Sequence, residues 1–188
     1  MVLKVEPLFL ALDAIGRGRG APSTVILTSP QGRVFSQAEA RRLAALDHLV
    51  IVSGRYEGID ERVREHLATE EISIGDYVLS GGELASLVIL DACARLIPGA
   101  VGDEGSVEAD SFTRGLLDFP QFTRPAEFRD WKVPDVLLSG HHEAIRRWRK
   151  REALRRTFER RPELLALAEL DDEERAMLRE LRREKGAE

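Results

Sequence analysis

Residues 72–84, "ISIGDYVLSGGEL", join a strand pattern to a glycine-rich turn and so decide the predicted fold. Apolar residues alternate at the start of this stretch, which predicts a strand. Gly81 and Gly82 follow, and residues 82–97, "GELASLVILDACARLI", predict a long apolar helix that Pro98 and Gly99 stop. A strand that leads through glycines into a helix is typical of a unit of a parallel sheet.

The preceding residues show the same alternation of strand and helix patterns. Residues 23–29, "STVILTS", predict a strand, and "PQG" predicts a turn directly after it. Ser36 and Glu39 form a capping box, which predicts the start of a helix that runs through Leu46. The further elements are a strand at 48–54, apolar on both faces as in a buried parallel sheet, and a helix at 59–68. We therefore expect an α/β fold with a parallel sheet.

The composition changes after Gly99. The stretch "GAVGDEGSVEADSF" is small, acidic and poor in apolar residues, which favours an exposed linker. Helical patterns follow at 141–160, from Pro162, and again from 172. These features predict two units: an α/β domain at 1–101 and a small all-helical domain at 116–188, joined by a linker at 102–115.

Composition excludes several classes of protein. The chain has 188 residues, of which 43% are hydrophobic and 32% are charged, as in ordinary globular proteins. Its apolar runs are too short to span a membrane, and no basic-then-apolar leader opens it. Cys93 is the only cysteine, so an internal disulfide and a cysteine-built zinc site are excluded. We expect a protein of the reducing cytoplasm that does not bind membranes.

Three loops follow the three predicted strands, and in a parallel sheet they would meet at one edge. Glycines in these loops would let the backbone approach a ligand closely, although ordinary turns explain them equally well. "GRGRG" at 16–20 superficially resembles a phosphate loop but lacks the preceding strand and the Lys-Ser/Thr pair. We expect it to form a flexible surface loop.

A basic stretch at 144–161 holds nine Arg or Lys and two Glu in a chain of net charge −5. Arg147, Arg151 and Arg155 recur every four residues and so share one helix face, with Arg146 and Lys150 beside it. This stripe favours an RNA contact, whereas the alternative is a solvated helix face.

Trp148 and the two histidines near the start of this region are more simply explained by packing and capping than by ligand binding. Trp148 could stack on a base, but its spacing from Ile145 favours a core position. His141 and His142 are adjacent at a helix start, which favours capping and packing over metal binding.

Ten short motifs occur in one order along most of the chain: "SPQGR", "GRYEGIDERV", "SIGDYVLSGGEL", "RLIPG", "DSF", "GLLD", "TRP", "VLLSGHH", "IRRWR" and "RRPELL". By these motifs the sequence resembles the bacterial tRNA (guanine-N1)-methyltransferases, the TrmD family of the SPOUT superfamily. The resemblance implies a SPOUT-like α/β domain with a C-terminal trefoil knot, whose loops hold S-adenosyl-L-methionine. Carried over by position, the cofactor-binding residues would be Ser29, Pro30, Gly54, Glu57, Ile74, Gly75, Asp76, Tyr77, Val78, Leu79, Gly81 and Gly82.

The resemblance also implies the catalytic groups. Asp110 would be the general base that removes the N1 proton of guanosine, and Arg95 would stabilise the charge that develops on O6. Magnesium is implied near Glu57 and Asp110. The target would be the guanosine 3′ of the anticodon, and Asp118 with the helical domain, including Arg146, Arg147, Arg151 and Arg155, would hold the anticodon stem-loop. The active site would be shared across a homodimer, because Asp110 would come from the partner.

One departure from the family pattern concerns the start of the chain. Members carry a strand, a helix and a Gly-rich loop before the point that corresponds to "MVLKVEPL". A chain that lacks them would expose a sheet edge. The alternative hypothesis is therefore a catalytically impaired tRNA-binding fragment of such an enzyme.

Overall fold

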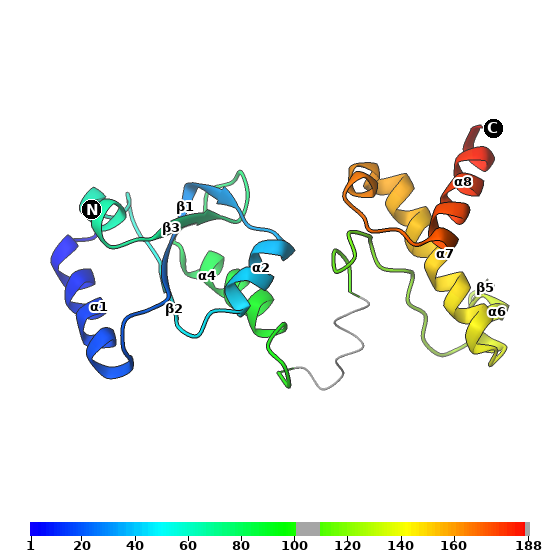
Figure 1. The fold of residues 1–188 in the computed structure, drawn as a ribbon, viewed down its shortest axis with the longest axis horizontal. Helices are drawn as coiled ribbons and strands as arrows, with labels where there is room; N and C mark the ends of the chain where they lie inside the picture. The colour runs from blue at the N-terminus through cyan, green and yellow to red at the C-terminus, as the bar shows by residue number, and fades with distance from the viewer. Residues whose placement is uncertain (101–109, 187–188) are drawn as a thin grey trace. The chain divides into compact units, whose positions relative to one another are not determined.

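The computed structural model describes residues 1–100 and 110–186, and the chain divides into two compact units, Met1–Glu104 and Gly105–Glu188 (Figure 1). Most of the predicted linker at 102–115 lies outside the described residues. In the described residues, no helix combines the length and the apolar character that crossing a membrane requires.

The first unit is a mixed α/β structure around a parallel sheet. Its strands lie in the order β2–β1–β3, and both outer strands run parallel to β1. The predicted parallel sheet is thus confirmed. The elements in chain order are α1 (Val5–Arg19), β1 (Thr24–Val34), α2 (Gln37–Ala44), β2 (Leu49–Val52), α3 (Glu61–His66), β3 (Glu70–Ser73) and α4 (Glu83–Ala94).

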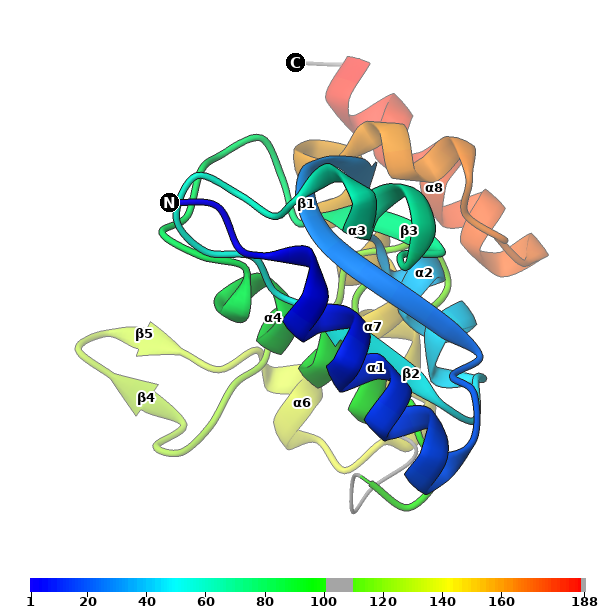
Figure 2. The ribbon, with the colours of Figure 1, turned by 90° about the vertical axis from the view of Figure 1, so that its left-hand side faces the viewer.

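Helices cover both faces of the sheet. Successive side chains of a strand point to opposite faces, so the apolar strands present a surface to be buried on each side. Ile26 of β1 packs with residues of α2 and α4 in one cluster, whereas the neighbouring Val25 packs with α3 and α1 in another. Figure 1 shows α1 on one side of the sheet and α2 and α4 on the other, and in Figure 2 α1 lies in front of β1 and β2. Cys93 of α4 belongs to the first cluster, and burial raises the pKa of its thiol.

The capping box forms as predicted: the Ser36 side chain accepts a hydrogen bond from the Glu39 N–H at the start of α2. The prediction that the strand ends at Ser29 in a turn at "PQG" is wrong. β1 continues to Val34, and its register against β3 shifts between Thr28 and Arg33. Gly32 permits this pairing, because a Cβ there would lie 2.5 Å from the Glu71 carbonyl carbon.

The expectation of a surface loop at "GRGRG" is also wrong. Residues 16–19 form the last turn of α1, and Gly20, with a φ of +84°, ends the helix. The helix persists through two glycines because Val5, Leu8 and Phe9 dock it against the sheet. Such packing outweighs the low helix propensity of glycine.

The second unit is mainly helical. Its core contains Leu116, Leu154, Met177 and Leu181, which bring α7 and α8 together. A two-stranded antiparallel hairpin departs from the all-helical expectation, and the helix predicted at Pro162 is a 3₁₀ turn. The elements are β4 (Glu127–Phe128), β5 (Trp131–Lys132), α6 (Asp135–Leu138), α7 (His142–Arg160), η1 (Pro162–Ala166) and α8 (Asp172–Gly186).

The start of α7 corrects the prediction for the two histidines. His141 occupies the N-cap position, but its side chain makes no capping hydrogen bond. Both His141 and His142 are exposed, so neither packs in the core. The cap fails because an imidazole reaches the first-turn N–H groups poorly compared with a short Ser or Asp side chain.

Candidate functional site

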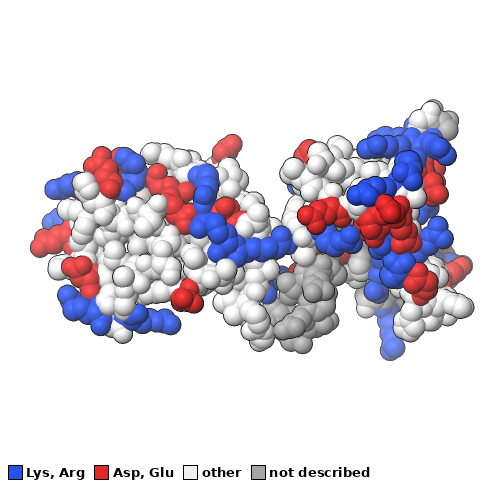
Figure 3. All heavy atoms as spheres, viewed as in Figure 1, with Lys and Arg blue, Asp and Glu red and all other residues white. Residues whose placement is uncertain are grey.

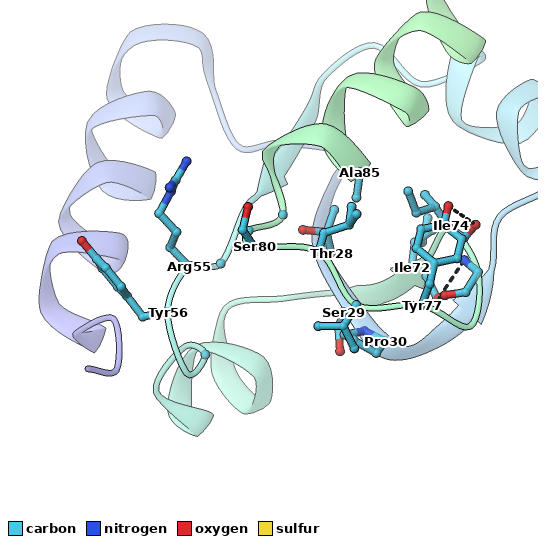
Figure 4. Close-up of a pocket in the computed structure, with 18 of the residues that line it drawn as sticks. Thr28, Ser29, Pro30, Arg55, Tyr56, Ile72, Ile74, Tyr77, Ser80 and Ala85 are labelled. Carbon is cyan, nitrogen blue, oxygen red and sulfur yellow. Dashed lines mark hydrogen bonds between the residues drawn. The ribbon is translucent and has the colours of Figure 1, made fainter.

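A cavity of about 280 Å³ lies where β2 and β3 end and α4 begins, beside residues 28–30 of β1. Its walls come from residues 28–30 of β1, from the loops after β2 and β3 and from the first turn of α4 (Figure 4). The carboxyl edge of a parallel sheet is the usual place for a ligand in open α/β folds. The structure brings together, in this cavity, the predicted cofactor residues Ser29, Pro30, Gly54, Glu57, Ile74, Gly75, Tyr77, Val78, Leu79, Gly81 and Gly82. The remaining one, Asp76, does not line it.

Short contacts fasten the loop after β2 to the loop that opens α4. The Gly82 N–H donates a hydrogen bond of 2.7 Å to the Gly54 carbonyl, and Arg55 and Gly81 form an isolated antiparallel bridge. The hydroxyl oxygens of Ser53 and Ser86 lie 2.7 Å apart. Loops tied in this way can hold a ligand site in one geometry.

Glycine is required at two points of the cavity for different reasons. Gly82 has an ordinary φ of −79°, but a Cβ there would lie 3.0 Å from the Gly54 nitrogen and closer still to the Thr28 hydroxyl. Gly75 has a φ of +141°, and the Tyr77 ring lies 2.6 Å from where its Cβ would be. The backbone at both positions is therefore approached more closely than any other residue would allow.

Tyr77 folds back over its own loop. Its hydroxyl donates to the Ile74 carbonyl at 3.1 Å, and its N–H donates to the Gly75 carbonyl at 3.0 Å. The Gly75 N–H in turn donates to the Ser73 Oγ at 3.1 Å. In Figure 4 the Tyr77 side chain lies beside Ile72 and Ile74. The turn at 73–77 is thus stabilised locally, next to the apolar wall of the cavity.

The charged side chains that line this cavity are Arg55 and Glu57. Arg55 Nε donates to Glu83 Oε1 at 2.6 Å, and this hydrogen bond lowers the pKa of the Glu83 carboxyl. Arg55 is therefore already neutralised by a carboxylate. Glu57 remains as an acid at a cavity that is otherwise polar-neutral and apolar, which suits a ligand with an apolar body and a cationic group.

Several lining residues were not predicted. They stand next to predicted ones in the chain, so the strand-end position could have indicated them: Thr28, Arg55, Tyr56, Gly58, Ile72, Ser73, Ser80 and Ala85. The loops themselves were recognised from the sequence, but the residues within them that face inward follow from the turn geometry.

The two predicted catalytic residues do not line this cavity. Arg95 is the C-cap of α4, whereas Ala85 of the first turn lines the cavity, so about 15 Å of helix separates them. Asp110 belongs to the second unit, where it lines a different cavity of about 620 Å³. Asp118, Arg146 and Lys150 line that second cavity as well.

Most of the basic stripe on α7 is paired with carboxylates, many of them from α8. Arg151 contacts Glu184 at 2.5 Å, and Arg155 pairs with Glu152. Lys150 lies 2.5 Å from Asp171; burial lowers the pKa of Lys150, but the hydrogen bonds to its carboxylate partners outweigh burial and raise it. Figure 3 shows basic and acidic side chains intermixed on the helical unit.

Arg146 and Arg147 differ in their degree of pairing. Arg146 contacts both Glu143 at 2.6 Å and Glu173 at 3.1 Å. Arg147 lies 3.9 Å from Glu173 and its side chain is 67% exposed. The predicted stripe of basic residues on α7 therefore exists. Among its residues, Arg147 has the longest contact with a carboxylate. Trp148 is half-buried beside Phe122, with ring centroids 6.3 Å apart.

The described residues contain no group of three or more His, Cys, Asp or Glu that could hold a metal ion. The two residues expected near magnesium, Glu57 and Asp110, line different cavities in different units. The donor set therefore does not fit a metal site within the described chain.

The fold and the site define a mixed α/β protein with a parallel sheet, a glycine-lined cavity at the carboxyl end of its strands and a second, mainly helical unit. Residues 1–167 match the family model described as tRNA (Guanine-1)-methyltransferase TrmD, and the chain belongs to this family.

Curated relatives carry the name tRNA (guanine-N(1)-)-methyltransferase. The protein of Halalkalibacterium halodurans is 52% identical over 184 residues, which cover 98% of this chain and 75% of the relative. That of Brevibacillus brevis is 57% identical over 185 residues, with coverage of 98% and 75%. A Dehalococcoides mccartyi protein is 55% identical over 181 residues, with coverage of 96% and 73%.

Proposed function

We propose that this chain is a tRNA (guanine-N1)-methyltransferase that transfers a methyl group from S-adenosylmethionine to N1 of the guanosine 3′ of the anticodon. The family membership supports the reaction. The observation that carries the cofactor assignment is that eleven of the twelve cofactor residues implied by the family resemblance line one cavity. In this proposal residues 1–101 bind the cofactor, 102–115 form the linker and 116–188 bind tRNA.

The cavity fits S-adenosylmethionine in its chemistry. Gly75 and Gly82 let the loops of the cavity pack closely on one another, and Ile72 and Ile74 offer an apolar wall to an adenine ring. Glu57 supplies a negative charge for the ammonium group of the methionine portion. When bound, S-adenosylmethionine supplies an electrophilic methyl group. We further propose that the loops around Gly54 and Gly82 form the trefoil knot of the SPOUT superfamily.

Two side chains of this protein would act on the guanine. N1 carries a proton at neutral pH, so its lone pair becomes available only when a base removes that proton. Asp110 would accept it, an effect worth typically ~10²–10⁴-fold in rate. Negative charge then grows on O6, where the Arg95 guanidinium would stabilise it.

The surface of α4 supports a homodimer with a shared active site. Leu84, Leu87 and Val88 are exposed large apolar side chains on one face of this helix. Arg95 follows at helical spacing on the same face. Covering this face with a second copy would bury apolar surface and place Arg95 at the interface. We propose that Asp110 is contributed by the partner subunit.

The helical unit would hold the anticodon stem-loop. Arg147 is the stripe residue most available to a phosphate, because Arg146, Arg151 and Arg155 would have to exchange closer carboxylate partners first. Asp118 accepts hydrogen bonds from the Phe119 N–H at 2.7 Å and from Gln121 Nε2 at 3.1 Å, so its carboxylate is held in place beside the second cavity.

The proposed reaction uses no magnesium ion in any step. The location of the protein in the cytoplasm stays a prediction.

Transfer of a labelled methyl group to a tRNA transcript tests the reaction. In this transcript the guanosine 3′ of the anticodon follows directly after another guanosine. We expect transfer by the unaltered chain, a loss of ~10²–10⁴-fold in Asp110→Asn, and an unchanged rate in Asp172→Asn, whose side chain is fully exposed on α8. Tight tRNA binding without transfer would instead support the alternative of a tRNA-binding fragment. Equal rates for Asp110→Asn and the unaltered chain would refute the role of Asp110.

A further inference from the structure

A groove of about 540 Å³ runs along the helical unit between residues 119–126 and the helices α6 and α7. Aromatic side chains form much of its wall. Phe122 is 47% exposed, and its ring lies 6.3 Å from that of Trp148 at an interplanar angle of 55°. The groove therefore presents a partly uncovered aromatic surface.

The charged side chains that line this groove are all positive. Its charged lining residues are Arg124 and Arg149, and no carboxylate residue lines it. The Arg149 guanidinium lies 4.9 Å from the centroid of the Phe119 ring, so its partner is an aromatic face. Among the residues that the structure describes, neither arginine is within ion-pair distance of a carboxylate.

This pairing distinguishes Arg149 from its neighbours on α7. Arg146 and Arg151 already contact carboxylates at 2.6 and 2.5 Å, so a phosphate would compete with an existing ion pair. Arg149 can bind a phosphate without losing such a partner, and it can keep its stacking on Phe119 while doing so. It borders both this groove and the adjacent cavity that contains Asp110.

An occupant that matches these features has a flat π-face and carries negative charge. An unpaired nucleotide has both, whereas the bases of a duplex are stacked and hidden. An apolar peptide would leave the two arginines without a partner. We propose that this groove binds the base of one unpaired nucleotide of the RNA substrate and that Arg149 binds the adjoining phosphate. The choice of tRNA as that substrate rests on the proposed function.

The test compares the full chain with three variants in binding two RNAs of equal length: a stem-loop with the sequence of an anticodon arm and a blunt duplex. Phe122→Leu keeps an apolar side chain but removes the stacking ring. Arg149→Gln removes the free charge, and Arg175→Gln removes an α8 charge that is paired with Asp172. Dissociation constants are measured across a series of salt concentrations, and the melting temperature of each variant verifies folding.

We expect Phe122→Leu to weaken stem-loop binding on the order of tenfold with an unchanged salt dependence. Arg149→Gln should weaken it as well and reduce the slope of log K against log salt by about 0.7. Arg175→Gln should leave stem-loop affinity nearly unaltered, and duplex binding should not respond to Phe122→Leu.

Three results would overturn the assignment. Equal losses in Arg149→Gln and Arg175→Gln would indicate attraction by net charge alone. Equal losses of stem-loop and duplex binding in Phe122→Leu would exclude an unpaired base, and a change in sedimentation of that variant without RNA would indicate that the groove contacts another protein copy. A chain that transfers no methyl group but shows the expected binding pattern refutes the proposed activity while the groove assignment stands.

Discussion

The backbone N–H of Gly82 lies 2.7 Å from the Gly54 carbonyl oxygen and donates a hydrogen bond to it. This bond joins the loop that follows β2 to the residue that caps α4, although 28 positions of sequence separate them (82 − 54). Two loops of the candidate cofactor cavity thereby have a fixed separation. Anything that enlarges Gly82 must disturb both.

Gly82→Ala should impair the cavity through contact alone, because the φ of −79° suits alanine. The new Cβ would press on the Gly54 nitrogen and the Thr28 hydroxyl. We expect a loss of about 1–3 kcal/mol in the free energy of unfolding and a clear weakening of S-adenosylmethionine binding in calorimetry.

Gly18→Ala is the matched control for that substitution. Gly18 lies in α1, and the methyl group of an alanine there would meet no neighbouring atom within 4 Å. Alanine there should raise the free energy of unfolding by about 0.5–1 kcal/mol and leave cofactor binding unaltered. Wild-type affinity in Gly82→Ala would show that the cavity does not hold the cofactor as proposed.

The exposed face of α4 yields a prediction about assembly. Leu87→Lys places a charge in the proposed dimer interface, and we expect it to convert a dimer into monomers in sedimentation velocity at micromolar concentration. Leu167→Lys changes an exposed leucine of the second unit and should leave the dimer intact. A dimeric Leu87→Lys would place the interface elsewhere.

Mixing two impaired variants, at an S-adenosylmethionine concentration too low for Gly82→Ala to act alone, tests whether the active site is shared. Asp110→Asn keeps the cofactor cavity, and Gly82→Ala keeps the base, so a mixed dimer contains one complete site if each subunit lends Asp110 to the other. Random exchange of subunits should restore about a quarter of the wild-type methyl transfer. No recovery, with subunit exchange verified by tagged chains, would indicate that each chain uses its own Asp110.

The Glu70 carboxylate predicts how stability depends on pH. It accepts hydrogen bonds from Arg42 Nη2 at 2.7 Å, from Thr24 Oγ1 at 3.1 Å and from Arg33 Nη2. Burial raises the pKa of Glu70, but these hydrogen bonds outweigh burial and lower it. Because the folded-state pKa is depressed, the stabilisation is complete above the unfolded pKa of about 4.3 and is lost as pH falls through the folded value.

Glu70→Gln should therefore cost about 1–3 kcal/mol at pH 7, since three side-chain donors lose a charged acceptor. In urea unfolding, the difference from wild type should shrink below about pH 4. Glu65→Gln alters an exposed acid of α3 and serves as the control. A deficit that does not vary with pH would show that the charge of Glu70 contributes nothing.

Sequence patterns correctly predicted those structural features that depend only on residues close together in the chain. Ser36 caps α2 because a hydroxyl three residues before an N–H can reach it wherever the helix lies. Predictions failed where distant packing decided the outcome. Gly16 and Gly18 are helical because α1 docks on the sheet, and β1 extends past Gly32 because β3 pairs with it.

The candidate sites divide in the same way. The sequence indicated the three stretches that line the candidate cofactor cavity, because their glycine-containing motifs are visible in the chain itself. It could not show that the arginines of α7 would meet the acids of α8, since Arg151 and Glu184 are 33 positions apart (184 − 151). The proposed role of Arg149 likewise depends on contacts that the sequence does not show, because Arg146 and Arg151 are paired with carboxylates and Arg149 lies over an aromatic ring.

The sequence by itself determined the alternation of strands and helices from β1 to α4, the helices α7 and α8 and the family to which the chain belongs, because caps and motifs act over a few neighbouring positions. The tertiary structure decided which loops face one cavity, which face of α4 stays uncovered and which cations have an aromatic partner in place of a carboxylate. These properties depend on distances between residues far apart in the chain, and packing alone sets those distances.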